Sequence, residues 1–495
     1  MVATCAFCVL LAALSLLAPS EPSFDPWAWL VWGREIAHLS LELTSGPSWK
    51  PLPVVFTTLF APWSAVDDDI PPALWMLVAR AGGLLAVALS FRLAARLVGG
   101  RAWRRWLAGG VAATALVMTP DWTRYLLHGS EAPLAIALLL WAVDRHLDGH
   151  RTSALGLGAL VCLARPELFG FLVAYAGYVW WSRPDRRALV ALGLGLVVGA
   201  WLLPGWLAAG DPLSAATSAR SEPSWSLSLA PVPWRAALDE VQRQTSLALE
   251  LTSLAATVLA LAARSRLPRP ARPGAVLALG GFGALVVTLF LAMTEAGFSG
   301  NPRYVLPALA SFAVLGGVGA ALLVDLGRQL ADGLGERLTL ARGSARLGAA
   351  AACAVVVAAA VPGIARRAGA VRDEARASIE RSRLHSDLDR AVAAVGPSYV
   401  TRFGPVTTNR PFQTHLAWEL SLRLPDVHGT DGRGILFRTP AGLLSGIVRV
   451  APRASRRALI ARVGSWTVSA RPASARHIYS WPAVGFDLRT AARRG

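Results

Sequence analysis

A carboxylate in an aromatic setting is the first feature of the sequence that suits chemistry. Asp25 lies in residues 23–29, a short segment that contains two tryptophans. A carboxylate can accept the proton of a hydroxyl group that attacks a carbon centre, and indole rings suit both sugar faces and a membrane interface. Because Asp followed by Pro is a common helix start, spacing alone favours a helix N-cap for Asp25 over a catalytic role. The candidate sugar-contacting tryptophans are Trp27, Trp29 and, in the next polar segment, Trp49.

Three basic residues are candidates for binding a phosphate group. Arg303 begins a long apolar run, where its guanidinium can snorkel to the membrane surface or hold a phosphate with several directed donors. Lys50 is the only lysine among 49 basic residues (Lys plus Arg), and chance retention explains it as simply as a function does. Arg124 lies in the polar segment 119–125. All three would stabilise a departing group that gains negative charge.

Further candidate substrate contacts are His128, Glu131 and Tyr304. Glu131 precedes an apolar run, so its charge also suits the positive end of a helix. Residues 165–167, Arg-Pro-Glu, interrupt another apolar run. Because the proline disfavours a straight helix, we predict that Arg165 and Glu167 have a structural role at this break.

No cofactor is predicted, and no residue is assigned as a metal ligand. Three aspartates at 67–69 precede an Ile-Pro-Pro sequence, which favours helix capping over binding of a divalent cation. The acidic and histidine residues of 144–150 lie on the predicted inner surface, where a solvated turn is the favoured interpretation. The four cysteines lie in apolar segments and lack the paired spacing of a disulfide or metal framework.

The elements that must position these residues are membrane-spanning helices. The chain of 495 residues is 54% hydrophobic and 16% charged, against roughly 45–50% and 25% for a soluble domain. The first apolar stretch lacks a positively charged amino-terminal region, which predicts an uncleaved span rather than a signal peptide. The break at 165–167 predicts two short spans there. The eleven predicted spans are residues 2–18, 73–90, 106–120, 131–143, 154–164, 167–181, 188–208, 246–263, 274–294, 304–324 and 347–362.

Arginine-rich loops predict the orientation. With the amino terminus in the cytoplasm, the inside loops contain the arginines of 92–105, 145–151, 183–187, 264–272 and 328–346. The outside loops are poorer in basic residues, as the positive-inside rule requires. The candidate residues then lie in the outer loops after spans one, three, five and nine, where four loops can form one cavity. The almost exclusive use of arginine indicates a GC-rich, bacterial genome.

A small α+β domain is predicted after the membrane domain, giving domains 1–364 and 365–495. Residues 371–395 have a helical pattern, and 398–402, 434–437 and 465–470 read as strands. The segment 365–495 holds 22 arginines and nine carboxylates, a balance of 22 − 9 = +13 out of a net +18. The odd number of predicted spans places this domain outside the cytoplasm. Its positive charge would suit acidic glycans or anionic headgroups as neighbours, while a simply solvated surface is the plainer interpretation of that charge.

The motifs together resemble those of the integral-membrane GT-C glycosyltransferases. They are the acidic residue in a tryptophan-rich first outer loop, Gly-Ser-Glu-Ala-Pro-Leu at 129–134, Arg-Pro-Glu at 165–167 and Asn-Pro-Arg-Tyr at 301–304. The chain is most similar to the actinobacterial arabinofuranosyl- and mannosyltransferases that use polyprenyl-phosphate sugars. The resemblance covers roughly residues 20–310, and the carboxyl-terminal domain looks like the variable appendage of such enzymes.

The resemblance implies roles for individual residues. The catalytic carboxylate of the family falls on Asp25, and the arginine near the donor phosphate falls on Arg303. The family often has a second acidic residue beside the first, but Pro26 occupies that position, which puts metal assistance there in doubt. The Arg-Pro-Glu-Gly motif of the family ends in Leu168 here, and its role is architectural.

The expected function is transfer of a sugar, with inversion, from a polyprenyl-phosphate donor to an envelope glycan or lipid during cell wall biogenesis. The reaction would take place at the outer face of a bacterial plasma membrane, without nucleic acid as a partner. One alternative is a transporter or flippase of a lipid-linked or anionic substrate, whose pathway the same arginines would line. Another is a non-catalytic envelope-assembly protein that retains the scaffold. No feature of the sequence identifies the sugar, the acceptor or the oligomeric state.

Overall fold

The computed structural model describes most of the chain and divides it into two compact units. The larger unit holds Met1–Arg383, and the smaller begins at Leu384. One helix, α16 (Arg342–Val395), contains this boundary, and the predicted boundary after residue 364 also falls inside it. The described residues are 1–220, 225–262, 267–337, 342–402, 404–429, 434–439 and 458–471.

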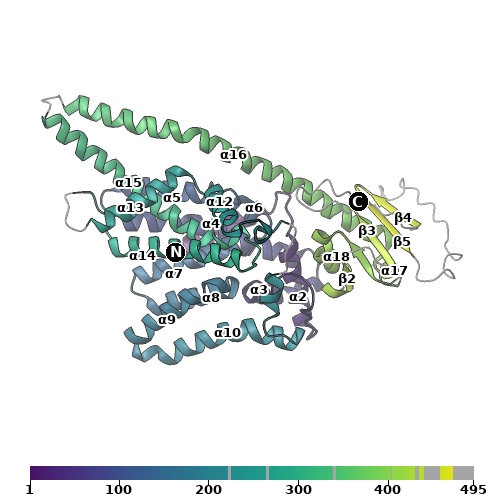
Figure 1. Ribbon diagram of the computed structural model, residues 1–495. Helices are drawn as coiled ribbons and strands as arrows, with labels where there is room; N and C mark the ends of the chain where they lie inside the picture. Colours follow the sequence, from purple (N-terminus) through teal and green to yellow (C-terminus); the bar gives the residue numbers. More distant parts are fainter. Residues whose placement is uncertain are drawn as a thin grey trace. The chain divides into compact units, whose positions relative to one another are not determined.

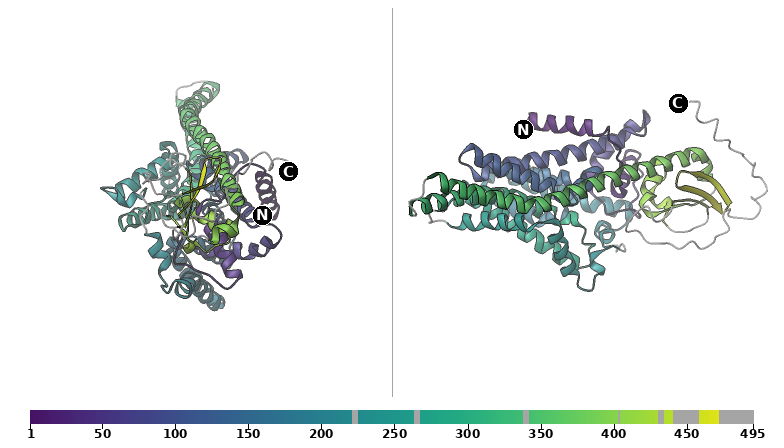
Figure 2. Two further views of the ribbon diagram at one scale, coloured as in Figure 1. Left: turned by 90° about the vertical axis from the view of Figure 1, so that its right-hand side faces the viewer. Right: turned by 90° about the horizontal axis from the view of Figure 1, so that it is seen from above.

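The larger unit is a bundle of helices lying side by side (Figures 1 and 2). Each of the eleven predicted spans overlaps a different helix, which confirms the expected polytopic α-helical fold. The helices before α16 are α1 (Val2–Ser15), α2 (Phe24–Ala37), α3 (Pro51–Phe60), α4 (Ile70–Val98), α5 (Ala102–Val117), α6 (Trp122–Leu127), α7 (Ala132–Leu147), α8 (Arg151–Ala164), α9 (Phe169–Ser182), α10 (Arg187–Ala209), α11 (Ser214–Ala219), α12 (Pro233–Gln244), α13 (Leu247–Leu261), α14 (Pro273–Glu295) and α15 (Leu306–Arg337).

Four helical segments of the described chain are long and apolar enough to cross a bilayer by themselves. They are α4, Pro184–Ala209, α14 and Leu306–Leu330, each longer than the roughly 20 residues that a bilayer requires. The pair α12 and α13, bent by 91°, is a fifth candidate if it forms one span, and α1 and α8 are shorter apolar helices. The chain is therefore a multi-pass membrane protein, while the number eleven stays a prediction.

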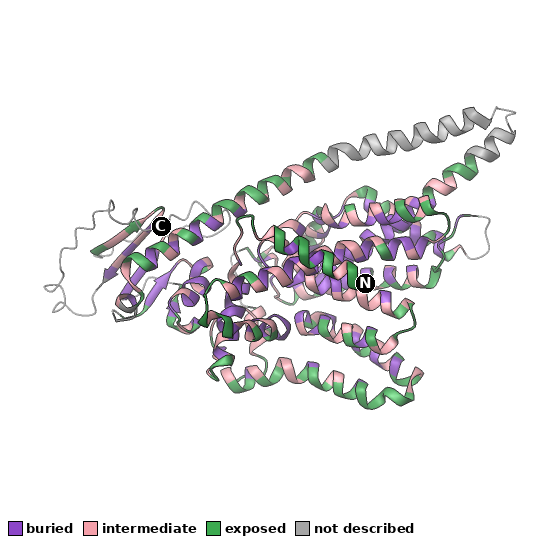
Figure 3. Ribbon diagram, turned by 180° about the vertical axis from the view of Figure 1, so that it is seen from behind, coloured by how far each residue is buried: buried purple, intermediate pink, exposed green. Residues whose placement is uncertain are grey.

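Helix α15 lies in the middle of the bundle because small residues let its neighbours approach. Of its apolar stretch, 67% is buried, against 17% for α10, which is exposed along most of its length (Figure 3). A Cβ on Gly317 would lie 2.1 Å from the carbonyl oxygen of Ala108 in α5, and one on Gly319 would lie 1.8 Å from that of Thr252 in α13. Such close helix packing is typical of membrane proteins.

The predicted helix break at residues 165–167 is confirmed. Helix α8 ends at Ala164, and α9 begins at Phe169 after a short 3-10 turn, Pro166–Leu168. Arg165 takes φ −137° and ψ 82°, which lies outside the helical region. This conformation is the one that a following proline imposes.

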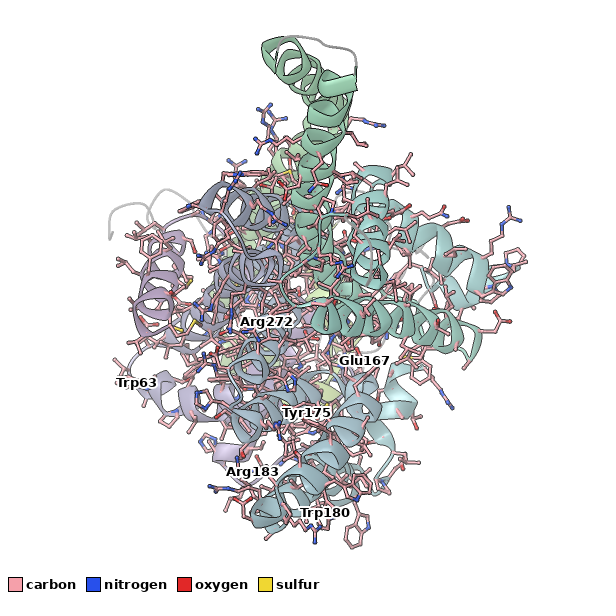
Figure 4. The ribbon with its side chains drawn as sticks, turned by 90° about the vertical axis from the view of Figure 1, so that its left-hand side faces the viewer. Trp63, Glu167, Tyr175, Trp180, Arg183 and Arg272 are labelled. Carbon is pink, nitrogen blue, oxygen red and sulfur yellow. The ribbon has the colours of Figure 1, made fainter. Side chains whose placement is uncertain are left out.

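The predicted solvated turn at 144–150 is wrong for its first residue. The Asp144 side chain is fully buried and accepts hydrogen bonds from Arg92 at 3.0 Å and from Arg96. Arg272 donates to the Leu147 carbonyl at 3.2 Å, and Figure 4 shows Arg272 and Arg183 from this end of the bundle. A buried carboxylate requires such cationic partners, so the arginines here form part of the packing.

The smaller unit contains a five-stranded mixed sheet, which confirms an α+β fold. The strand order is β2-β1-β3-β5-β4, with β1 parallel to β2 and β3, and β5 antiparallel to β3 and β4. Its elements are α17 (Pro397–Arg402), β1 (Val406–Thr408), α18 (Gln413–Glu419), β2 (Val427–His428), β3 (Gly434–Arg438), β4 (Ala458–Val463) and β5 (Trp466–Arg471).

Two of the three predicted strands are confirmed, as β3 and β5. The third, at 398–402, is wrong, because this segment forms α17. The reason is local: Gly396 has a positive φ of 85°, and Pro397 then occupies the first helical position, where its fixed φ suits a helix start. The helix predicted at 371–395 is present, but it continues without interruption from the segment predicted as the last span.

Candidate functional site

Asp25 lies in the first turn of α2, and its side chain faces another part of the chain. Ser23 is the N-cap residue of this helix, so the interpretation of Asp25 as a helix cap is wrong. The Oδ2 atom of Asp25 accepts a hydrogen bond from Nη1 of Arg303 at 2.6 Å. A carboxylate and a guanidinium from opposite ends of the larger unit's sequence therefore lie side by side.

Arg303 is held in place by the turn that precedes α15. The 3-10 turn Pro302–Tyr304 begins after Asn301, whose Oδ1 accepts hydrogen bonds from the Arg303 backbone N–H and from the Tyr125 hydroxyl, both at 3.1 Å. The Arg303 side chain is 19% exposed. The guanidinium of Arg303 therefore faces Asp25 and does not snorkel to the surface.

Lys50, Glu131 and Arg165 form a second group of charges. Lys50 is the N-cap residue of α3, and its Nζ bonds to Oε1 of Glu131, the fully buried N-cap residue of α7. Arg165 donates to the same oxygen at 3.4 Å and lies 3.3 Å from Glu167, which Figure 4 labels. The break between α8 and α9 thus supplies a cation to the buried end of α7.

Tyr304 links the two groups of charges. The Arg165 guanidinium lies 5.4 Å from the centre of its ring, and the Arg303 guanidinium lies 6.0 Å away. A cation over an aromatic face is attracted by the ring quadrupole. We call these two groups, together with Glu167 and Tyr304, the charged cluster: Asp25, Lys50, Glu131, Arg165, Glu167, Arg303 and Tyr304.

The environment of Lys50 makes its charge sensitive to pH. Burial and the nearby guanidinium of Arg303 together lower the pKa of Lys50 to about 8, although the charge of Glu131 opposes this change. The Lys50 ammonium also lies 5.6 Å from the ring centre of Trp29. An incoming anion would favour the charged amine, because opposite charges at short range raise the pKa of a base.

The charged cluster can bind an anion and accept a proton. It contains three cations and three carboxylates, and a phosphate can replace a carboxylate as the partner of Arg303 or Lys50 with charge-assisted hydrogen bonds. Nε of Arg303 and Nη2 of Arg165 are buried and have no hydrogen-bond partner among the described residues. Such donors favour an additional acceptor, because a buried donor without one costs free energy.

The predicted aromatic contacts lie in the interior. Trp27, Trp29 and Trp49 are all buried. Trp29 packs edge-on against Trp75 with 5.4 Å between ring centres, and Trp49 packs against Trp32 at 5.7 Å. Their burial favours a packing role, and the stacking of a sugar on these rings stays a prediction.

Arg124 and His128 lie outside the charged cluster. Arg124 is exposed on α6 and has no ion pair among the described residues. His128 is buried, and its Nε2 lies 3.3 Å from Oε1 of Glu374 in α16. The His128 carbonyl accepts a hydrogen bond from the backbone N–H of Ser23, the N-cap of α2, at 3.0 Å. His128 therefore connects α16 to the start of the helix that carries Asp25.

The pKa values of His128 and Glu374 are both lowered. For His128 the largest cause is burial, which outweighs the opposing effect of Glu374. Burial alone would raise the pKa of Glu374, but the nearby imidazole of His128 and the charge of Arg381 lower it to about 2. No local pattern in the sequence distinguishes Glu374 from its neighbours. The sequence did not predict a role for Tyr125 either, although its hydrogen-bond partner Asn301 lies in the Asn-Pro-Arg-Tyr motif.

Comparisons with known proteins agree with the fold. The sequence matches no protein-family model, and a search of curated proteins finds no significant similarity. The structure is similar to that of ArnT from Cupriavidus metallidurans bound to undecaprenyl phosphate, with a TM-score of 0.55 and 14% identity over 96% of this chain and 98% of that one. It is also similar to ArnT in the apo state, with a TM-score of 0.53 and 14% identity over 94% and 97% of the two chains. ArnT is a GT-C glycosyltransferase, so the chain has the expected GT-C fold.

Proposed function

We propose that this protein is a membrane glycosyltransferase that moves a sugar from a polyprenyl-phosphate donor to an envelope glycan or lipid. The fold is compatible with many activities, so the proposal rests on the site. Its main support is the contact between Asp25 and Arg303, which combines a proton acceptor with a phosphate-binding group. The lipid phosphate in the similar ArnT structure makes the same class of donor a reasonable choice here.

Asp25 acts as the general base in this proposal. A sugar hydroxyl of the acceptor attacks the anomeric carbon of the donor, and Asp25 accepts the hydroxyl proton. A new glycosidic C–O bond forms as the bond between the anomeric carbon and the phosphate oxygen breaks. General-base catalysis of this kind accelerates a reaction by roughly 10²–10⁴-fold. Because the attacking oxygen enters opposite the leaving group, the anomeric configuration inverts.

Arg303 and Lys50 stabilise the departing polyprenyl phosphate. The leaving phosphate gains negative charge in the transition state, so cations that are already in place stabilise it more than they stabilise the bound donor. Arg303 provides a planar fork of donors, and Lys50 provides a compact charge. Arg165 neutralises Glu131 and keeps Lys50 oriented, which makes it a positioning residue. The scheme uses no cofactor.

The reaction would take place at the outer face of a bacterial plasma membrane, with the charged cluster on that side. This assignment follows from the arginine distribution along the sequence. The resemblance to arabinofuranosyl- and mannosyltransferases makes polyprenyl-phosphate arabinofuranose and polyprenyl-phosphate mannose the first donors to test.

Reconstitution in proteoliposomes tests this function. The purified chain is supplied with each radiolabelled polyprenyl-phosphate sugar and an envelope glycan extract, and both labelled product and leaflet exchange of the donor are measured. A new alkali-stable glycosidic product that depends on the protein supports the proposal. Exchange of the donor between leaflets without such a product contradicts it and favours a flippase.

A further inference from the structure

The smaller unit contains a group of metal-ligand side chains that the proposed function does not use. Asp389 on α16 and His415 and Glu419 on α18 each offer one ligand atom, and these atoms all lie within 4.8 Å of one another. His415 Nε2 lies 3.1 Å from Oδ1 of Asp389 and 3.5 Å from Oε1 of Glu419. We propose that Asp389, His415 and Glu419 bind a divalent transition-metal ion that clips α16 to α18.

The distances fit a common metal ion. First-row divalent ions bind imidazole nitrogen and carboxylate oxygen at about 2.0–2.2 Å. Two ligands at that distance, on the edge of a tetrahedron or octahedron around one ion, lie roughly 2.8–3.6 Å apart. Both distances from Nε2 of His415, 3.1 and 3.5 Å, fall in this range.

The spacing along the two helices explains why the ligands meet. His385 and Asp389 are four residues apart on α16, and His415 and Glu419 are four residues apart on α18. Residues at this spacing lie on one face of a helix. Each helix therefore presents a histidine and a carboxylate to the other, and three of these four side chains supply the ligands.

His385 orients the histidine ligand. Its Nδ1 lies 2.7 Å from Nδ1 of His415, and its ring packs against Phe412 with 5.1 Å between centres. If Nδ1 of His415 carries the proton and donates it to His385, Nε2 keeps the lone pair that a metal ion would bind, 3.1 Å from Asp389 and 3.5 Å from Glu419. Metal-bound histidines generally donate their other ring N–H to a fixed acceptor, which sets the tautomer.

One nitrogen and two carboxylates indicate the class of ion. Imidazole favours Zn²⁺, Fe²⁺ and their neighbours over Mg²⁺ and Ca²⁺. His415 is buried, whereas Asp389 is 42% exposed and Glu419 26% exposed, so the ion would keep coordination positions open on the carboxylate side. The site would thus hold Zn²⁺, or Mn²⁺ where that ion is more abundant, with water completing the coordination.

A proton is the rival occupant. Burial alone would lower the pKa of His415, but the adjacent carboxylates of Asp389 and Glu419 raise it to about 9. An imidazolium between two carboxylates would satisfy the same three side chains without a metal. The two occupants differ in that only the metal responds to chelators and added ions.

Metal binding to the purified full-length chain distinguishes them. The protein is stripped with EDTA at about pH 7.5, and Zn²⁺ binding and the Co²⁺ absorption spectrum are measured, together with the unfolding temperature. We expect about one tightly bound ion per chain, a visible Co²⁺ ligand-field band and a rise in unfolding temperature on Zn²⁺ addition. Mg²⁺ at the same concentration should not raise the unfolding temperature.

Variants locate the site. Asp389→Asn and Glu419→Gln should each weaken Zn²⁺ binding by at least about tenfold, and His385→Gln should weaken it about 10–100-fold through the orientation of His415. Asp387→Asn is the matched control, because Asp387 lies on the same helix and bonds to Arg390 instead. Wild-type affinity in Asp389→Asn, or no Zn²⁺ effect in the unmodified protein, overturns the proposal in favour of the imidazolium pair.

Discussion

Arg303 donates a hydrogen bond of 2.6 Å to Asp25, a residue 278 positions earlier in the chain. This contact joins the first turn of α2 to the start of α15, the central helix of the bundle. Because α15 is packed closely on α5 and α13 through Gly317 and Gly319, the arginine is supported by a rigid element. The proposed base and the proposed phosphate-binding group are therefore held at hydrogen-bond distance by the core of the fold.

Replacing Arg303 should reduce transfer more than it reduces stability. Arg303→Gln removes a cation that stabilises the leaving phosphate, and loss of one such donor lowers kcat by roughly 10²–10³-fold. Arg303→Lys should recover part of this loss because it restores the charge without the planar fork. Steady-state transfer kinetics provide the measurement. Arg235→Gln, an exposed arginine on α12, is the control and should behave as the unmodified protein.

Donor binding should weaken above about pH 8. Since burial lowers the pKa of Lys50 to about 8, the amine is charged and attracts a phosphate below that pH, and it is neutral above it. Binding of polyprenyl phosphate near pH 8 should also take up a proton, because the bound anion raises the pKa of Lys50. The dissociation constant measured across this pH range tests the prediction.

Lys50→Arg is the comparison for the pH effect. Arginine stays charged throughout the range, so binding by this variant should show no inflection near pH 8, even if its affinity is lower. The same inflection in both proteins would assign the titration to another group.

Replacing Glu131 should destabilise the protein. Glu131→Gln leaves the buried Lys50 and Arg165 without their shared carboxylate, and removing one partner of a buried ion pair typically costs about 3–5 kcal/mol. The unfolding temperature in detergent should fall markedly. Glu380→Gln, at an exposed position of α16, should change stability by less than about 0.5 kcal/mol. Equal stability of the two variants would argue against a structural role for Glu131.

A methyl group on Gly319 should disturb the bundle. The added Cβ would lie 1.8 Å from the Thr252 carbonyl oxygen, so α13 and α15 must separate, at a cost of roughly 1–3 kcal/mol. Gly327→Ala is the matched control, because nothing lies within 4 Å of a Cβ at that position of the same helix. The fraction of monodisperse protein after mild heating should fall for Gly319→Ala alone.

The sequence predicted the helices well because hydropathy is a local property. Eleven apolar runs each marked a helix, and Pro166 marked the break between α8 and α9. The predicted grouping of Asp25, Glu131 and Arg303 depended on motif order and the alternation of loops. In the structure Arg303 contacts Asp25 and Lys50 contacts Glu131, and the ring of Tyr304 lies near Arg165 and Arg303.

Contacts between distant segments could not be predicted from local patterns. Trp29 of α2 packs against Trp75 of α4, and Trp49 packs against Trp32 of α2, so each contact joins separate segments of the chain. The pairing of His128 with Glu374 joins residues in α16 and the α6–α7 loop, and neither has a distinctive neighbourhood in the sequence. Strands β1 and β2 are only three and two residues long, and β4 is largely apolar without strict alternation, so none of them has the alternating pattern of β5.

The most direct test of the account is transfer activity after replacing Asp25 with asparagine. The variant keeps the size of the side chain but cannot accept a proton, so transfer should fall by about 10²–10⁴-fold while polyprenyl-phosphate binding and the unfolding temperature stay close to those of the unmodified protein. Asp68→Asn, an exposed aspartate before α4, is the control and should retain full activity. Full transfer by the Asp25→Asn protein would contradict the assignment of Asp25 as the base.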